Sequence, residues 1–286
     1  MLTFIESISL AGDRTKQNDD AFGFTDDCAW VIDGATDLHD KPISGAASDA
    51  AWFAQALSTA LYAFAAPKAG NELFLRQLLR DALERRVIAD FHTRSGGQTI
   101  EGWQRPMASM AMAAQSSESA DVLVGLDLGD CRCFVLDAAG SLHAAGGPPG
   151  GRDAEASAAA RQTDAEKPLL ERTATIELLR RSRNAMNRPG AQWTVGLDPD
   201  CASYARAWRF DLVRPAHVLL MTDGFALLAD QYRAYDAAGL VRGALSKGLQ
   251  ELGRELRAIE ADDADSAKYP RFKASDDATA LLMRLM

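Results

Sequence analysis

Several features that would define a function are scarce in this sequence of 286 residues. Its four cysteines, Cys28, Cys131, Cys133 and Cys201, are too few and too scattered for a disulfide framework. The four histidines lie far apart, so a zinc site is not expected. Basic residues are outnumbered, because 31 lysines and arginines against 40 acidic residues give a net charge of −9. This balance argues against nucleic acid and anionic membrane surfaces as partners, since Lys and Arg supply most of that affinity.

The sequence also lacks a signal peptide, a convincing membrane span and an internal repeat. Its first ten residues contain Glu6, have no basic start and lead into the polar stretch 13–20. Residues 50–67 carry no charge, but they are rich in alanine and too weakly apolar for a membrane span. They predict a buried helix instead. A cytoplasmic protein with one domain, spanning 1–286, is therefore expected.

Apolar residues make up 47% of the chain, which indicates a folded protein rather than a disordered one. Runs of strands are separated by a helix pair, without strict strand–helix alternation. This order predicts an α+β architecture, with antiparallel sheets covered by helices. A hairpin turn is expected at 137–140 and a flexible loop at 146–151. The expected strands are 5–10, 29–32, 108–113, 122–128, 131–136, 208–212, 217–221 and 278–285, and the expected helices are 45–66, 71–94, part of 153–188, and much of 225–261.

Acidic residues gather where predicted strands begin or end. Asp33 and Asp223 each follow an apolar run and precede a glycine, which allows another backbone to approach closely. A single Asp-Gly is most simply explained as an ordinary turn. Here, however, the two are joined by the acidic pairs Asp19–Asp20 and Asp276–Asp277, each placed directly before a strand.

A metal site follows if these carboxylates converge. Asp19, Asp33, Asp223 and Asp276 would bring a charge of about −4 into one cleft, which requires counter-ions. Two divalent cations would balance it, and a set of oxygen ligands favours Mg²⁺ or Mn²⁺. Two such metals on rigid strand ends are suited to the hydrolysis of phosphate esters.

The order of these motifs resembles the metal-dependent protein phosphatases of the protein phosphatase 2C type, over nearly the whole chain. The similar segments are 14–21 (Arg-Thr-Lys-Gln-Asn-Asp-Asp-Ala), 31–34 (Val-Ile-Asp-Gly), 108–111 (Ala-Ser-Met-Ala), 129–132 (Gly-Asp-Cys-Arg), 219–224 (Leu-Leu-Met-Thr-Asp-Gly) and 276–279 (Asp-Asp-Ala-Thr). The resemblance implies an αββα sandwich, in which two antiparallel β-sheets are flanked by helix pairs. It also implies a single catalytic domain, as in bacterial members of the family.

The resemblance assigns metal ligands. Asp33 would bridge two Mn²⁺ or Mg²⁺ ions, and Gly34 would offer its carbonyl oxygen. Asp223 and Asp276 would hold one ion, while Asp19 would bind near the other.

Further roles follow from the same resemblance. Asp20 would orient a metal-bound water, and Asp130 would help to hold a third, looser ion. The family's phosphate-binding arginine falls at Thr15, with Arg14 and Lys16 on either side. We expect Arg14 to reach the cleft, because its planar guanidinium suits a phosphate better than a lysine does.

The activity implied is hydrolysis of phosphoserine and phosphothreonine in proteins, the products of a Ser/Thr kinase, by a hydroxide that two metals activate. Departures from the family pattern leave two alternatives open. Asp277 replaces the usual asparagine, and Leu227 stands where many members have a further acid. The chain would then be a pseudophosphatase that binds phosphoproteins without cleaving them, or a phosphatase of small phosphate esters.

Other polar residues are expected to be structural. Arg180, Arg181 and Arg183 predict a solvated helix face, although such a patch could also receive a phosphorylated partner. Cys131 and Cys133 should pack as small apolar residues. The histidines should lie on the surface or in packed positions; they are His39, His92, His143 and His217.

Overall fold

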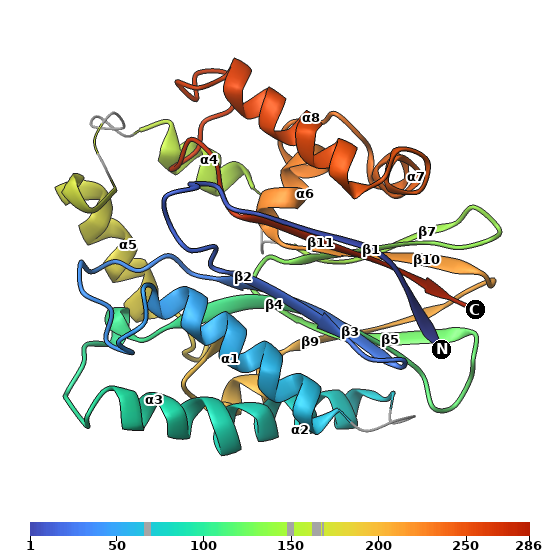
Figure 1. The fold of residues 1–286 in the computed structure, drawn as a ribbon, viewed down its shortest axis with the longest axis horizontal. Helices are drawn as coiled ribbons and strands as arrows, with labels where there is room; N and C mark the ends of the chain where they lie inside the picture. Colours follow the sequence, from blue (N-terminus) through green and yellow to red (C-terminus); the bar gives the residue numbers. More distant parts are fainter. Residues whose placement is uncertain (66–69, 148–151, 162–166, 168) are drawn as a thin grey trace.

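Two antiparallel β-sheets lie face to face in the computed structural model, which describes residues 1–286 except 66–69, 148–151, 162–166 and 168 (Figure 1). The first sheet has the strand order β1 (Leu2–Leu10), β11 (Ala278–Leu285), β10 (Ala216–Met221), β6 (Arg132–Leu136) and β7 (Leu142–Gly146). The second has the order β2 (Asp20–Phe24), β3 (Cys28–Gly34), β4 (Met107–Gln115), β5 (Val122–Leu128) and β9 (Arg206–Asp211), and the short β8 (Val195–Gly196) pairs with β4.

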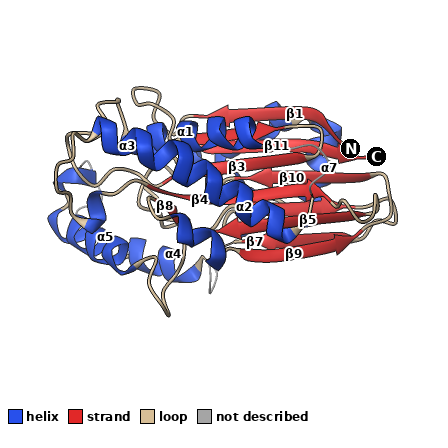
Figure 2. Ribbon diagram, turned by 90° about the horizontal axis from the view of Figure 1, so that it is seen from below, coloured by secondary structure: helices blue, strands red, loops and turns tan. Residues whose placement is uncertain are grey.

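Helices cover the outer face of each sheet (Figures 1 and 2). The second sheet is covered by α1 (Asp49–Phe64), α2 (Glu72–Ala82) and α3 (Ile88–Arg94), the last two joined by a π-helical turn (Leu83–Val87). The first sheet is covered by α6 (Asp223–Asp230), α7 (Ala237–Lys247) and α8 (Leu249–Asp262). Two more helices, α4 (Asp153–Ala159) and α5 (Thr173–Ala185), lie at the end away from the termini. Short 3-10 helices cover Gly102–Gln104, Leu169–Glu171 and Pro199–Tyr204.

The central strands are buried on both faces, which explains their continuous apolar sequences. In β3, Trp30 and Ile32 pack with the helices of the outer layer, whereas Ala29 and Val31 pack between the sheets. Successive side chains of a strand point to opposite faces, so one strand contributes to two cores. Three stacked cores result, as the implied αββα sandwich requires.

Residues 50–64 of the charge-free stretch form nearly all of α1, so the predicted helix is present, but it begins at Asp49 rather than at residue 45. Ser48 caps this helix by accepting a hydrogen bond from the Ala51 amide, 3.1 Å away, and Trp52 and Phe53 are buried against the second sheet. Among the described residues, no helix has both the length and the apolar character to cross a membrane.

Most other predicted elements are confirmed. The strands 122–128 and 278–285 have the predicted bounds, and the stretch 153–188 is helical in part, in α4 and α5. The hairpin turn at 137–140 is present, with the Gly140 amide bonded to the Asp137 carbonyl oxygen at 3.0 Å. Most of the predicted loop 146–151 lies outside the described residues.

Candidate metal centre

The predicted aspartates meet at the end of the sandwich opposite the termini. Asp20, at the start of β2, is paired across the sheet with Asp33, near the end of β3. Asp223 follows β10 and Asp130 follows β5, so four strand ends contribute carboxylates. Asp276 precedes β11. We call Asp20, Asp33, Asp130, Asp223 and Asp276 the acidic cluster.

Three members of the acidic cluster are in mutual contact distance. Asp33, Asp130 and Asp223 each place a carboxylate oxygen within 4.8 Å of the other two. Burial, followed by the charges of Asp223 and other acidic neighbours, raises the pKa of Asp33 well above its ordinary value. Burial also acts to raise the pKa of Asp223, but the charge of Arg152 and a hydrogen bond from Asp33 leave it lowered. Such an arrangement needs positive charge to keep both carboxylates ionised.

Asp20 is buried and only half satisfied. Its Oδ2 accepts a hydrogen bond from the Thr222 hydroxyl at 2.8 Å, while its buried Oδ1 has no hydrogen-bond partner among the described residues. Burial raises the pKa of Asp20. Because β2 and β10 belong to different sheets, the Thr222–Asp20 bond also joins the two sheets beside the site.

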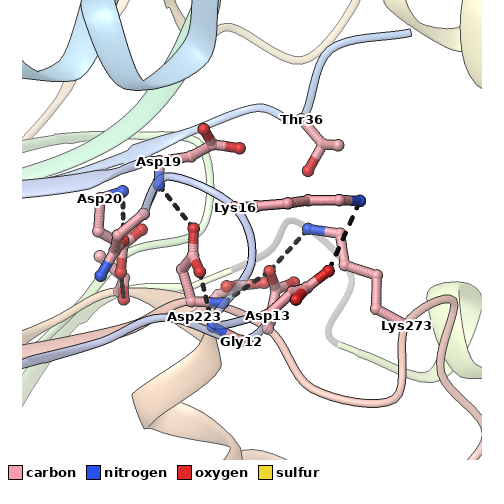
Figure 3. A network of polar contacts seen from close by, with 12 residues as sticks. Gly12, Asp13, Lys16, Asp19, Asp20, Thr36, Asp223 and Lys273 are labelled. Carbon is pink, nitrogen blue, oxygen red and sulfur yellow. Dashed lines mark hydrogen bonds and ion pairs between the residues drawn. The ribbon is translucent and has the colours of Figure 1, made fainter. Parts of the chain in front are cut away.

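Asp19 lies at the edge of the acidic cluster. Its carboxylate accepts a hydrogen bond from the Ser48 hydroxyl at 2.6 Å. Its amide donates to Asp277 at 2.6 Å (Figure 3). The second Asp277 oxygen accepts the Gly12 amide at 2.8 Å. Each of the two carboxylate oxygens of Asp277 therefore accepts a hydrogen bond from one backbone amide. An asparagine could not replace it in both bonds in the same way, because its side-chain nitrogen only donates.

Two glycines allow the close backbone approaches predicted after the aspartates. A Cβ atom on Gly34 would lie 2.6 Å from the Asp19 carbonyl oxygen, and one on Gly224 would lie 2.0 Å from that of Asp277. Neither space admits a side chain. The first contact brings the segment around Asp19 against the turn at Gly34. The second brings the segment before β11 against the turn at Gly224.

Two cations neutralise part of the charge. Arg152 forms an ion pair with Asp223 at 2.6 Å. Lys273, labelled in Figure 3, forms one with Asp276 at 2.7 Å. Burial acts to lower the pKa of Lys273, but the charge of Asp276 and its hydrogen bond raise it. Neither cation was singled out from the sequence. Lys273 could have been found from its i, i+3 spacing to Asp276, whereas Arg152 is 71 residues from its partner.

The residues present fit divalent metal ions of the hard type. Four members of the acidic cluster, Asp33, Asp130, Asp223 and Asp276, line a cleft of about 220 Å³. Asp20, which pairs with Asp33 in the sheet, adds the buried Oδ1 that has no partner among the described residues, so the cluster offers only oxygen ligands. The nearby Cys131 thiol stays protonated, because burial raises its pKa. Carboxylate oxygens around a cleft suit Mg²⁺ or Mn²⁺ better than a softer metal.

The expected phosphate-binding residues are not part of the acidic cluster. Arg14 is exposed and lines neither this cleft nor the adjoining cavity described below. Lys16 is 78% exposed, and its ammonium lies 4.0 Å from Asp13 (Figure 3). A different cation, Arg183 of α5, lines the cleft itself.

A family model described as "Protein phosphatase 2C" matches residues 13–251. The chain belongs to the protein phosphatase 2C family. It is thereby a metal-dependent protein serine/threonine phosphatase, of a family that uses Mn²⁺ or Mg²⁺. No curated protein sequence matches the chain.

Solved structures of bacterial proteins share the fold of this phosphatase. The Mycobacterium tuberculosis serine/threonine phosphatase PstP/Ppp is 14% identical, with a TM-score of 0.58 over 99% of this chain and 98% of that one. A structure of the PstP catalytic domain with two manganese ions is 15% identical, with a TM-score of 0.56 and 99% of both chains covered. PppA of Pseudomonas aeruginosa, described as a key regulatory component of T6SS, is 19% identical, with a TM-score of 0.57 and both chains fully covered.

The prediction of a solvated face on α5 of this phosphatase is wrong for two of its three arginines. Arg180 lies 3.9 Å over the Trp103 ring and donates to the Leu38 carbonyl oxygen at 2.6 Å. Arg183 donates to the Thr36 carbonyl oxygen at 2.9 Å. Both guanidinium groups therefore face the protein, because the segment after β3 presents free carbonyl oxygens to α5.

The histidine and cysteine predictions agree with the structure where it describes their surroundings. His39 packs on Trp103 and lies 3.0 Å from Asp49, whose carboxylate also accepts the Ile43 and Ser44 amides. These bonds fold the segment before α1. With Asp37, His39 and Asp49 also form a group whose ligand atoms lie within 4.8 Å of one another, close enough to hold a metal ion. Cys131 and Cys133 are buried in the core between the sheets, as expected.

Proposed function

We propose that this phosphatase hydrolyses phosphoserine and phosphothreonine in proteins phosphorylated by a Ser/Thr kinase, as a single cytoplasmic catalytic domain with two divalent cations at the acidic cluster. One observation carries the proposal, namely the meeting of Asp33, Asp130 and Asp223 within 4.8 Å. When bound there, Mn²⁺ or Mg²⁺ would supply positive charge to the phosphoryl oxygens and lower the pKa of an attacking water.

The ligand roles in the proposal are those that the family resemblance assigns. Asp33 would serve both cations, and the Gly34 carbonyl would add a neutral ligand. Asp223 and Asp276 would hold one cation, and Asp19 would support the other. Asp130, which is within reach of both Asp33 and Asp223, serves a third cation.

Asp20 would orient the attacking water. Its Oδ2 is fixed by the Thr222 hydroxyl, so its buried Oδ1 can accept a hydrogen bond from water in a defined direction. Thr222 is itself fixed, because its hydroxyl oxygen accepts the Thr279 amide at 2.9 Å. A carboxylate held in this way also receives a proton without a change of side-chain conformation.

Phosphate binding falls to a cation near the cleft. Arg14 stays the proposal made from the sequence, with Lys16 beside it on the same exposed segment. Arg183 is a further candidate, since it lines the cleft and carries the planar donor set that suits a phosphoryl group.

The test is turnover of a phosphoserine peptide under controlled metal. We expect activity to be lost in EDTA and restored by Mn²⁺ or Mg²⁺, but poorly by Ca²⁺, whose looser coordination is less suited to this chemistry. Full activity in the presence of chelator would exclude the proposal.

One observation favours a second candidate, a module that binds phosphoproteins without cleaving them. Asp223 and Asp276 are already paired with Arg152 and Lys273, which would oppose metal binding. Titration calorimetry with Mn²⁺ on Lys273→Met, with the exposed Lys268→Met as control, measures this opposition. We expect tighter Mn²⁺ binding in Lys273→Met alone. If no phosphate ester is turned over in Mn²⁺ while phosphopeptides bind, the second candidate replaces the first.

A phosphatase of small phosphate esters is the third alternative. It would be supported only if a small aryl phosphate were hydrolysed in Mn²⁺ while phosphopeptides were not. The same assay therefore separates all three.

A further inference from the structure

A separate cavity adjoins the metal cleft on its α5 side. It has a volume of about 220 Å³ and lies between α5, α6 and the segment before Asp276. We call it the α5 cavity. Its apolar walls are formed by Leu38, Leu169, Leu179, Met186, Leu227 and Phe272.

The α5 cavity is continuous with the metal cleft. The two share lining residues, among them Thr36, Arg183 and Met186, together with the cluster acids Asp223 and Asp276. A molecule with its phosphoryl group at the acidic cluster can therefore extend a neighbouring group into the α5 cavity. Leu227, four residues after Asp223, contributes an apolar side chain to the wall of the α5 cavity.

Positive charge lies at the boundary between the two spaces. Within the described part of the chain, no carboxylate forms an ion pair with Arg183, which donates to the Thr36 carbonyl oxygen. Burial lowers the pKa of Arg183 to about 10, so it remains charged at neutral pH. A half-buried guanidinium of this kind is complementary to an anionic group placed between the apolar walls and the cleft.

The size of the cavity suits one large apolar side chain. An apolar cavity of about 150 Å³ in a protein holds a benzene molecule. The α5 cavity, at about 220 Å³, has room for a leucine or phenylalanine side chain. The cavity also has polar lining residues, among them Arg152, Arg271 and Lys273. A charged or amide side chain that packed on the leucines and Phe272 would nevertheless lose its water without gaining partners on that surface, which costs free energy.

We propose that the α5 cavity binds the apolar side chain of a residue next to the phosphorylated serine or threonine of the substrate, with Arg183 at the boundary between that side chain and the phosphoryl group. This inference rests on the proposed function and adds its substrate preference. The occupant is a segment of a phosphorylated protein, because a small phosphate ester without a neighbouring side chain would leave the α5 cavity unused.

The test compares phosphoserine peptides that differ at one residue. Leucine or asparagine is placed directly before or directly after the phosphoserine, and kcat/KM is measured in Mn²⁺. We expect the leucine peptide to be preferred roughly tenfold to a hundredfold at one of these positions, the effect of burying one such side chain. O-phosphoserine, which has no neighbouring residue, serves as the reference substrate.

A variant that fills the cavity provides the matched comparison. Ser182→Trp places a large ring from α5 at the cavity wall, whereas Glu177→Trp adds the same ring on the exposed side of α5. We expect Ser182→Trp to raise KM for the leucine peptide about tenfold and to leave its kcat within about twofold, since the pocket contributes uniform binding. Turnover of O-phosphoserine should be unchanged in both variants.

The outcomes separate the two proposals. If O-phosphoserine and both peptides are hydrolysed with no preference for leucine, or if Glu177→Trp matches Ser182→Trp, the inference fails and the proposed function stands. If no phosphate ester is hydrolysed in Mn²⁺, the proposed function fails and the inference with it.

Discussion

The folded protein opposes the ionisation of Asp33 when no cation is present. Asp33 is surrounded by other carboxylates at a buried strand end, and burial together with Asp223 raises its pKa. A residue that serves function in this way lowers the stability of the fold. This loss of stability can be measured with asparagine at position 33, because asparagine cannot ionise and has nearly the same size as aspartate.

We expect Asp33→Asn to be more stable than the wild type in EDTA and inactive in Mn²⁺. The melting temperature should rise by about 2–4 °C for each kcal/mol of repulsion removed, and kcat/KM should fall at least about 100-fold. Differential scanning calorimetry and a phosphopeptide assay measure the two effects. Asp13→Asn, an exposed acid outside the acidic cluster, should change neither. A destabilised Asp33→Asn would contradict the repulsion described here.

Three cationic side chains are candidates for binding the phosphoryl group of the substrate. Arg14→Ala, Lys16→Ala and Arg183→Ala should differ in KM for a phosphate ester and in inhibition by inorganic phosphate. Loss of one guanidinium–phosphate contact costs about 1.5–3 kcal/mol, which is roughly a tenfold to hundredfold rise in KM. Mn²⁺ affinity should hardly change in any of them. If only Lys16→Ala is affected, both arginines are excluded as the phosphate-binding residue.

The residues of the site were predictable to different degrees. Asp33 and Asp223 could be found because strand, carboxylate and glycine are adjacent in the sequence. Arg183 could not be assigned, since its partner Thr36 is 147 residues away and no local pattern joins them. Arg14 was expected because it adjoins Thr15, where the family's arginine falls, and because its guanidinium suits a phosphate. The segment that follows β1 is irregular, so strand alternation does not fix the direction of the Arg14 side chain.

At the scale of elements, α5 buries few of its side chains against the rest of the protein. Its last turns are joined to the segment after β3 by Arg180 and Arg183, and Arg180 also stacks on Trp103. Of its thirteen residues, only Thr175 and Ile176 are buried. A helix with so small a buried surface depends strongly on these polar and ring contacts.

We therefore expect Arg180→Ala to loosen α5 without unfolding the protein. Amide hydrogen exchange in 173–185 should become about tenfold faster, because a ring contact and a hydrogen bond together contribute on the order of 1–2 kcal/mol. Exchange in β3 and β10 should not change. Arg181→Ala is the control, since its side chain is exposed on the same helix. Equal exchange in the two variants would show that Arg180 does not hold α5.

The periodicity of the sequence predicted the strands and helices, but it did not predict the π-helical turn or which polar side chains of α5 face the protein. The strands were visible because helices and the opposite sheet bury both faces, which leaves continuous apolar runs. The π-helical turn Leu83–Val87 was not predicted, since it interrupts a helix without a glycine or proline to mark it. The solvated face expected on α5 was wrong, because helical spacing does not tell which polar groups lie opposite.

At the scale of the whole molecule, the acidic cluster lies across the two sheets. Asp20 and Asp33 belong to the second sheet, whereas Asp223 and Asp276 adjoin strands of the first. Like charges on both sides push the sheets apart at this end, and cations bound between them would hold the sheets together. Metal binding should therefore stabilise the entire fold, not only the site.

We expect saturating Mn²⁺ to raise the melting temperature measured in EDTA-treated protein by about 5–10 °C. At a free Mn²⁺ concentration of 100 Kd the stabilisation is about 2.7 kcal/mol, and each kcal/mol shifts the melting temperature by about 2–4 °C in a chain of this size. Asp33→Asn, with its central ligand removed, should lose most of this shift. An equal shift in that variant would place the stabilising metal elsewhere.

The rise in melting temperature caused by Mn²⁺ should depend on pH, and the raised pKa of Asp19 predicts the direction of that dependence. Burial raises the pKa of Asp19 from 3.8 to about 6, so without metal its ionisation lowers the stability of the folded state as the pH rises from about 4 to about 6. Mn²⁺ binds the ionised carboxylates and reverses this loss, whereas protons compete with it at low pH. Calorimetry at pH 5 and pH 7.5 should therefore show a larger Mn²⁺-induced shift at pH 7.5. A larger shift at pH 5 would mean that Mn²⁺ binds groups other than these buried carboxylates.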